Sequence, residues 1–210
     1  MGLLDSLAPD LLLRKKRDSE MEEDLRKHWL RPGEGLLLWH APIPGYTGGR
    51  IGDELRLPHV PVRQVPEHRF GKCDWPKPHE LTTGPGFDGI DWADDQAFSY
   101  WFEARQGEQD AVWFADHFTD GWGAAKVVLS DQRIAVVYHS AQLRESGQSL
   151  LTTALELPAG RLADVGMPFA GRSVPPPRVI RLGFADGSAL YLRDDLTRLR
   201  VERAWQLMRG

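Results

Sequence analysis

The sequence predicts an α+β, mostly β, fold in which a curved β-sheet or barrel is capped by a C-terminal helix. Two hairpin patterns, at 126–137 and 179–192, support this prediction because each joins two apolar runs through a polar turn. The turn of the second pattern contains an Asp-Gly pair, a strong hairpin signal between alternating apolar runs. An amphipathic helix with Asp194 or Asp195 as its N-cap follows and closes the sheet.

Residues 1–33 are predicted to form an N-terminal helical segment. Its clearer helix begins at a capping box formed by Ser19 and Glu22 and ends before Pro32. The apolar stripe of this helix, which we expect to pack on the following domain, consists of Met21, Leu25 and Trp29.

The first seventeen residues have the layout of a helix that lies on a membrane surface. Pro9 interrupts this pattern after two turns, so a flexible or docking N-terminus is favoured over a membrane anchor. For the alternative in which this segment contacts an anionic membrane, the contact residues are Leu3, Leu7, Leu11, Arg14, Lys15, Lys16 and Arg17.

Residues 34–210 are predicted to form the main domain, with a core of about 34–40 and 122–210. The apolar run 36–39 is its first strand. The intervening segment, about 42–118, is rich in proline, glycine and aromatic residues, so we expect it to be mostly extended or looped and to fold over the domain. We interpret it as a large insertion, with a separate small domain as the alternative.

Alternating aromatic residues predict a β-hairpin inside this insertion. Its two strands are expected at 97–104 and 110–118, joined by the polar turn 106–109.

Further short strands are predicted at 154–157 and 162–165. The main domain then contains a strand, a hairpin, two bent strands, a second hairpin and a closing helix, an order similar to that of the pleckstrin-homology superfold. The sequence 128–134 resembles the leucine, serine or threonine, aspartate, any residue, arginine hairpin of bacterial pleckstrin-homology-like (PH-like) domains of the high-GC actinobacterial type. Residues 157–165 resemble their next bent strand, and 184–188 their last hairpin.

The resemblance covers about residues 122–210 and implies a scaffold that presents a sheet edge or loops to a partner. The insertion of about 42–118 departs from it, because the usual bacterial module passes almost directly from its first strand to its second. Nothing in this chain matches a basic phosphoinositide-binding loop, so no lipid-binding residues are carried over.

Charge is distributed unevenly along the chain, whose formal net charge is −4. Residues 41–121 carry seven basic and fourteen acidic side chains, which disfavours nucleic acid as a partner. Residues 122–210 carry twelve basic and eight acidic side chains, a mild positive excess compatible with an anionic membrane surface. The single cysteine, Cys73, and the lack of an apolar run of about twenty residues favour a cytoplasmic protein.

Aromatic residues in and beside the insertion supply the candidate binding surface. Aromatic side chains at strand spacing more often build a core, but a groove for a peptide or small ligand is the alternative. The residues predicted to bind a partner are Trp75, Trp92, Trp101, Trp113 and Arg133.

Candidate chemical groups give no recognised active site. His68, Cys73, His79 and His117 are the best potential metal ligands, but their spacing matches no known class of metal site, so we predict neither metal nor cofactor.

The leading functional hypothesis is therefore a non-enzymatic adaptor with a PH-like domain that recognises a protein partner. This recognition could take place at the inner face of the membrane. The alternative is a small hydrolase or metal-dependent enzyme with its site in 66–120, which requires that Asp116 or His117 converges with the other candidate ligands. The second alternative is a peripheral lipid-binding protein.

Overall fold

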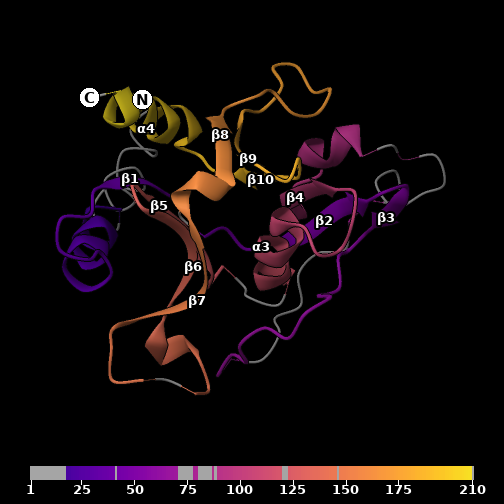
Figure 1. Cartoon of the computed structure of the whole chain (residues 1–210). Coiled ribbons are helices and arrows are strands. Elements are labelled where there is room, and N and C mark those ends of the chain that lie inside the picture. The colour runs from indigo at the N-terminus through magenta and orange to yellow at the C-terminus, as the bar shows by residue number, and fades with distance from the viewer. Residues whose placement is uncertain are drawn as a thin grey trace, which may run out of the picture.

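The computed structural model describes residues 18–40, 42–70, 78–79, 87, 89–119, 123–145 and 147–209. The fold is α+β and mostly β, as predicted, with its strands divided between two sheets (Figure 1).

The first sheet has four antiparallel strands in the order β1 (Leu36–Trp39), β5 (Lys126–Ser130), β6 (Arg133–His139) and β7 (Leu151–Pro158). This confirms the predicted first strand and first hairpin. In the turn of that hairpin, the Ser130 hydroxyl accepts hydrogen bonds from the backbone N–H groups of Gln132 and Arg133. Such local bonds are the reason that serine favours tight turns.

The second sheet has six strands in the order β3 (Glu54–Arg56), β2 (Tyr46–Ile51), β4 (Phe98–Ala104), β10 (Ala189–Arg193), β9 (Val179–Phe184) and β8 (Leu162–Gly166). Strands β9 and β10 form the predicted second hairpin, whose turn places Gly187 at a φ of 83°. Strands β2, β3 and β4 all come from the segment 42–118 and join this sheet through the pairing of β4 with β10.

Three helices complete the described structure: one over residues 18–28, α3 (Asp110–Thr119) and α4 (Thr197–Arg209). Three short 3-10 helices, η1 (Ile90–Asp94), η2 (Ser140–Gln142) and η3 (Ala159–Arg161), lie in the connections. The 18–28 helix and α3 lie on opposite sides of the four-stranded sheet (Figure 1).

The main core lies between the two sheets. Leu129 and Val136 of the first sheet meet Phe102 and Leu190 of the second, and Phe114 of α3 is fully buried among them. A smaller core joins the other face of the four-stranded sheet to the 18–28 helix through Leu25, Trp29, Val128 and Val137. Side chains of β5 therefore alternate between the two cores, as expected for a strand covered on both faces.

The predicted Ser19–Glu22 capping box does not cap the first helix. Asp18 is already helical, so Ser19 lies within the helix. The Glu22 carboxylate instead accepts hydrogen bonds from Arg26, one turn along, and from Arg203 of α4. These bonds lower the pKa of Glu22 to about 2, Arg203 having the largest effect.

The prediction of a strand at 110–118 was wrong, because this segment forms helix α3. The buried face of this helix contains residues at three- and four-residue spacing, namely Ala111, Phe114, Ala115 and Phe118. Over only a few residues, such a pattern resembles the alternation of apolar and polar side chains in a strand. The predicted strand at 97–104 is confirmed as β4.

The N-terminus of α3 is capped by residues that are distant in the sequence. The Asp186 carboxylate accepts a hydrogen bond from the backbone N–H of Asp110 at 2.7 Å, and the Ser188 hydroxyl accepts one from the N–H of Ala111 at 3.1 Å. Both acceptors lie in or beside the β9–β10 turn, so this turn supplies the cap that the local sequence of α3 lacks.

Replacing Asp186 with alanine is therefore expected to lower the free energy of unfolding by about 1–2 kcal/mol, because it removes a helix cap and the bonds that order the turn. Urea unfolding measures this loss. Glu108→Ala, beside the same helix but without a capping bond to the described residues, is the control and should change stability by less than about 0.5 kcal/mol. Equal stability of the two variants would contradict the capping role.

Candidate functional site

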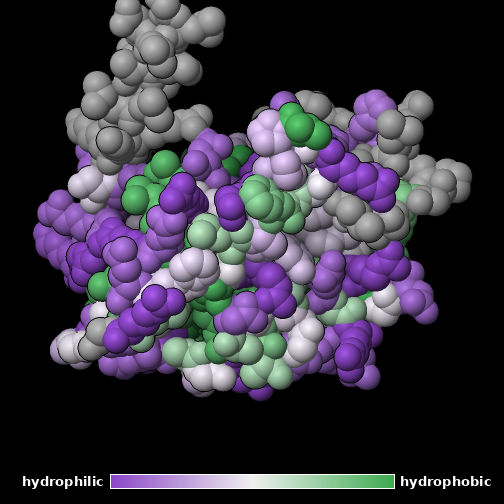
Figure 2. Space-filling model, turned by 90° about the horizontal axis from the view of Figure 1, so that it is seen from above, coloured by the Kyte–Doolittle hydropathy of each residue, from purple (hydrophilic) through white to green (hydrophobic). Residues whose placement is uncertain are grey.

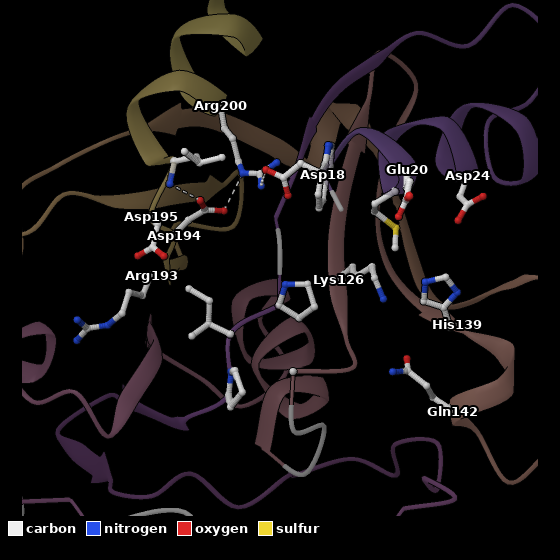
Figure 3. A pocket seen from close by; sticks show the side chains of 17 residues that line it. Asp18, Glu20, Asp24, Lys126, His139, Gln142, Arg193, Asp194, Asp195 and Arg200 are labelled. Atoms are coloured by element: carbon white, nitrogen blue, oxygen red, sulfur yellow. Dashed lines mark hydrogen bonds and ion pairs between the residues drawn. The ribbon is translucent and has the colours of Figure 1, made fainter. Parts of the chain in front are cut away.

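A cavity of about 730 Å³ opens where the 18–28 helix, the four-stranded sheet and the β10–α4 connection meet. Figure 3 shows its lining residues, which come from segments that are far apart in the sequence. Most are charged or polar, and the apolar remainder includes Trp39 and the prolines at 42 and 44.

Lys126 is more deeply buried than the arginines of this cavity, with only 3% of the residue exposed. It lies on the face of β5 that carries Val128, so its side chain emerges beside the 18–28 helix rather than in the main core. Its ammonium donates one long hydrogen bond, of 3.3 Å, to the carbonyl of Ala124, and no carboxylate among the described residues forms an ion pair with it. Burial consequently lowers the pKa of Lys126 to about 8.

His139 and Gln142 lie beside Lys126. His139 follows Val137, the partner of Lys126 across the β5–β6 pair, by two residues and so projects from the same face of the sheet. Figure 3 shows the Lys126 ammonium, the His139 ring and the Gln142 amide at one end of the cavity. Burial lowers the pKa of His139, and the positive charge of Lys126 lowers it further.

The opposite end of the cavity is a closed ion-pair cluster. The Arg200 guanidinium lies 2.9 Å from the carboxylate of Asp194 and 3.1 Å from that of Asp18, and it stacks over the ring of Trp39. Arg193, also in the lining, donates its hydrogen bonds to the backbone carbonyls of Ala93, Asp95 and Phe98. The charges of both arginines are therefore engaged in holding the fold together.

The loop 167–178, between β8 and β9, is a second prominent feature. Its tip exposes 96% of Val174, and three consecutive prolines follow. The Asp94 carboxylate of η1 accepts hydrogen bonds from the backbone N–H groups of Arg172 and Ser173, at 2.6 and 3.1 Å. Burial would raise the pKa of Asp94, but these bonds outweigh it and lower the pKa.

The base of the same loop is also fixed. The backbone N–H of Ala170 donates to the carbonyl of Pro177 at 2.9 Å, and the Arg178 guanidinium stacks over the Phe169 ring at 4.0 Å. The loop therefore presents an exposed apolar side chain on a backbone tied at both its tip and its base.

A smaller cavity, of about 360 Å³, lies beside α3 and includes Trp113, Asp116 and His117 in its lining. The Nε2 atom of His59 lies 2.7 Å from an Asp116 carboxylate oxygen, but both side chains are almost completely buried. Asp116 also accepts hydrogen bonds from the backbone N–H groups of Val62 and Arg63. The two carboxylate oxygens of Asp116 thus hold the chain at 59–63 against α3.

The predicted enzyme ligands come together only in part. His68 and His117 both pack against the ring of Tyr138, at 5.4 and 5.9 Å between ring centroids. His79 lies elsewhere, where its backbone N–H donates to Asp95. Within the described ranges, no group of three or more histidine, cysteine or acidic side chains is placed to hold a metal ion.

Trp92 and Trp101 belong to the core rather than to an open groove. They are 4% and 2% exposed and stack on each other at 6.0 Å between ring centroids, so neither is available to a ligand at the surface. Trp113 is half-buried under the Arg63 guanidinium, 3.4 Å from its ring.

Arg133 is also buried, at 5% exposure, and forms ion pairs with Glu34 and Glu156. Its guanidinium donates four hydrogen bonds, to these two carboxylates and to the carbonyl of Trp29, which gives it a structural role.

Several predicted residues lie outside the part of the chain that the structure describes. They are Trp75 and Cys73, and the proposed membrane-contacting residues Leu3, Leu7, Leu11, Arg14, Lys15, Lys16 and Arg17. Each helix in the described ranges is too short or too polar to cross a bilayer.

Sequence reasoning missed both the Lys126 cavity and the tied loop. A lysine at the start of the apolar run Lys126–Leu129 was the available signal for the cavity, since a charged side chain on a strand that is covered on both faces must find a polar space. The signal for the loop was the triple proline after Val174, which stiffens the backbone next to an apolar side chain.

Comparison with known proteins gives no match for this chain among family models, curated proteins or solved structures.

Proposed function

We propose that this chain is a non-enzymatic binding module of the PH-like type, which recognises a protein partner in the cytoplasm. The order of the elements supports the PH-like scaffold. Setting aside the segment 42–118, the chain runs through the strand β1, the hairpin β5–β6, the strands β7 and β8, the hairpin β9–β10 and the helix α4. The segment 42–118 extends the second sheet through β4.

The observation that carries the proposal of a protein partner is Val174, held almost fully exposed at the tip of the tied loop 167–178. An apolar side chain on a preorganised backbone loses little conformational entropy on binding, so its burial contributes to affinity. Strand β8, which leads into this loop, is an edge of the six-stranded sheet and therefore has backbone groups that are not paired within it.

The face around the loop agrees with a small, specific contact. Figure 2 views the molecule from above, the side on which α4 and the 167–178 loop lie in Figure 1. Hydrophobic residues on this face form small, separate groups among hydrophilic ones. Recognition through one apolar anchor in a polar surround fits this face better than a broad apolar interface.

The test is quantitative capture of binding proteins from a cell lysate by the tagged full-length chain and by two matched variants. Val174→Asp places a charge at the proposed contact, whereas Val60→Asp places the same charge at another exposed valine, on the chain between β3 and η1. Burial of one valine is worth about 1.5–3 kcal/mol, so we expect Val174→Asp to weaken capture of a specific partner by at least about tenfold. Val60→Asp should leave capture unchanged.

The loop anchor gives an independent variant. Asp94→Ala removes the acceptors of the Arg172 and Ser173 N–H groups, so the loop is no longer held, although the Val174 side chain itself is unchanged. This variant should also weaken capture. Capture of the same proteins in equal amounts by all variants would refute the proposed contact.

A further inference from the structure

The Lys126 cavity has features that a binding module acting through loop 167–178 does not use. Lys126 is only 3% exposed, and its ammonium has one long hydrogen bond, which is costly unless something else offsets the loss of solvent. The Gln142 side-chain oxygen in the same cavity is likewise buried without a hydrogen-bond donor among the described residues.

We infer that Lys126 is a nucleophilic amine that forms a reversible imine with a small, uncharged aldehyde or ketone admitted to this cavity. The inference is independent of the proposed protein partner, since the cavity and the loop are different sites.

The charges around the cavity favour an uncharged ligand over an anion. His139 of β6 lies beside Lys126 in the lining. The other charged groups of the lining are Glu20 and Asp24 of the first helix and Arg193, Asp194, Asp195 and Arg200 of the β10–α4 region, with Asp18 beside Arg200. Both arginines are engaged by carboxylates or carbonyl groups. An anion would therefore meet one available ammonium and several carboxylates, whereas a neutral carbonyl compound avoids this repulsion.

The state of the amine agrees with this chemistry. With a pKa of about 8, Lys126 is about one-quarter neutral at pH 7.5, against about 0.1% for a lysine at the ordinary value. A weaker base is also a weaker nucleophile. With the dependence on pKa that is known for thiols, the lower pKa reduces the rate of attack by the neutral amine about tenfold. The net expectation is a rate of imine formation about tenfold above that of an exposed lysine.

His139 is placed to move the protons of this reaction. The lone pair of the neutral Lys126 nitrogen forms the C–N bond, and the carbonyl π electrons move to oxygen. One proton passes from the nitrogen to this oxygen, which gives a neutral carbinolamine. The nitrogen lone pair then forms the C=N bond as the hydroxyl leaves, and the second nitrogen proton passes to that hydroxyl, which departs as water. Since its pKa is lowered from the ordinary histidine value, the His139 ring is neutral at pH 7.5 and can accept the proton from nitrogen and return it to the leaving hydroxyl.

The test uses the full-length chain with benzaldehyde and cyanoborohydride at pH 7.5. Cyanoborohydride reduces each imine to a stable amine, and peptide mass mapping over time then gives the rate at each of the chain's six lysines. Lys27, exposed on the first helix, is the internal reference. We expect Lys126 to be modified about tenfold faster than Lys27 in the folded chain, and the two rates to become equal in urea.

Two histidine variants test the proton transfer. His139→Gln should slow modification of Lys126 by at least about tenfold and leave Lys27 unchanged, while the matched variant His28→Gln, at an exposed histidine, should change neither rate. Circular dichroism checks that both variants are folded. A folded chain in which Lys126 is modified no faster than Lys27, or not at all, would overturn the inference.

Discussion

Replacing Glu34 with glutamine is expected to lower the free energy of unfolding by about 3–5 kcal/mol, because it leaves the buried Arg133 guanidinium without its main counter-charge. Arg133 donates from Nε and Nη2 to the two Glu34 oxygens, at 2.7 and 3.0 Å. The Glu34 side chain is fully buried and that of Arg133 is 6% exposed. Urea unfolding monitored by tryptophan fluorescence measures the loss.

Glu156→Gln is the matched control. Glu156 pairs with the same guanidinium at 2.5 Å, but one-third of its side chain is exposed, so water replaces much of the lost interaction. We expect this variant to lose about 1 kcal/mol or less. Similar losses for the two variants would contradict the view that burial makes the Glu34 pair the important one.

The same pair predicts how stability depends on pH. Burial would raise the pKa of Glu34, but the bonds from Arg133, the Arg31 N–H and the Ser130 hydroxyl lower it to about 2, from 4.5 for an ordinary glutamate. A carboxyl whose pKa is lower in the folded state stabilises the fold above its unfolded pKa and loses that contribution as the pH falls toward the folded pKa. The chain should therefore lose stability between about pH 4.5 and 2, with a smaller loss in Glu34→Gln.

The buried Glu34–Arg133 ion pair also gives a physical reason for the hairpin sequence that resembles PH-like domains. Ser130 and Arg133 both bind the Glu34 carboxylate, and Asp131 accepts a hydrogen bond from the N–H of Gly35 at 3.0 Å. The β5–β6 turn is thereby fixed to the residues that lead into β1. Arg133 also binds the carbonyl of Trp29, just after the first helix, so the turn joins this helix to the four-stranded sheet.

The hairpins and the C-terminal helix were predictable because their signals are local. The Asp-Gly turn and the apolar runs on either side of it lie within a few residues of each other, and so do the serine and aspartate of the first hairpin. The helix α4 follows from the amphipathic pattern of its sequence, and Val201 and Ala204 lie on its buried face.

The segment 42–118 was less predictable because distant residues determine its structure. Strand β2 pairs in parallel with β4 and contains two adjacent glycines, which hide the strand pattern. The rings of Trp101 and Phe102 explain these glycines, since a side chain on Gly48 or Gly49 would overlap them. Similarly, the cap that makes α3 a helix comes from Asp186 and Ser188, about 76 residues further along the chain.

The candidate sites were missed for a related reason. Residue types alone drew attention to tryptophans and histidines, most of which the fold uses for packing, as with Trp101 and the Tyr138 cluster. The cavity around Lys126 forms only where the first helix and the sheet meet, and these come from distant parts of the chain. The loop of Val174 is likewise held by Asp94, which belongs to another segment.

Replacing Asp116 with alanine is expected to cost about 3–5 kcal/mol, because three donors lose their acceptor in a dry environment. These donors are the Nε2–H of His59 and the backbone N–H groups of Val62 and Arg63. Asp164→Ala, which removes a half-exposed carboxylate paired with Arg181, should cost less than about 1 kcal/mol. Urea unfolding of the two variants gives the comparison.

Hydrogen exchange distinguishes this structural role of Asp116 from that of a catalytic partner of His59. If Asp116 holds the chain at 59–63 against α3, the amides of Val62 and Arg63 should exchange much faster in Asp116→Ala, even in conditions where the rest of the chain stays folded. The amide of His59 binds the carbonyl of Thr47 independently and should change less. Unchanged exchange at Val62 and Arg63 would remove the structural explanation and make the His59–Asp116 pair, with the small cavity beside it, a candidate active site.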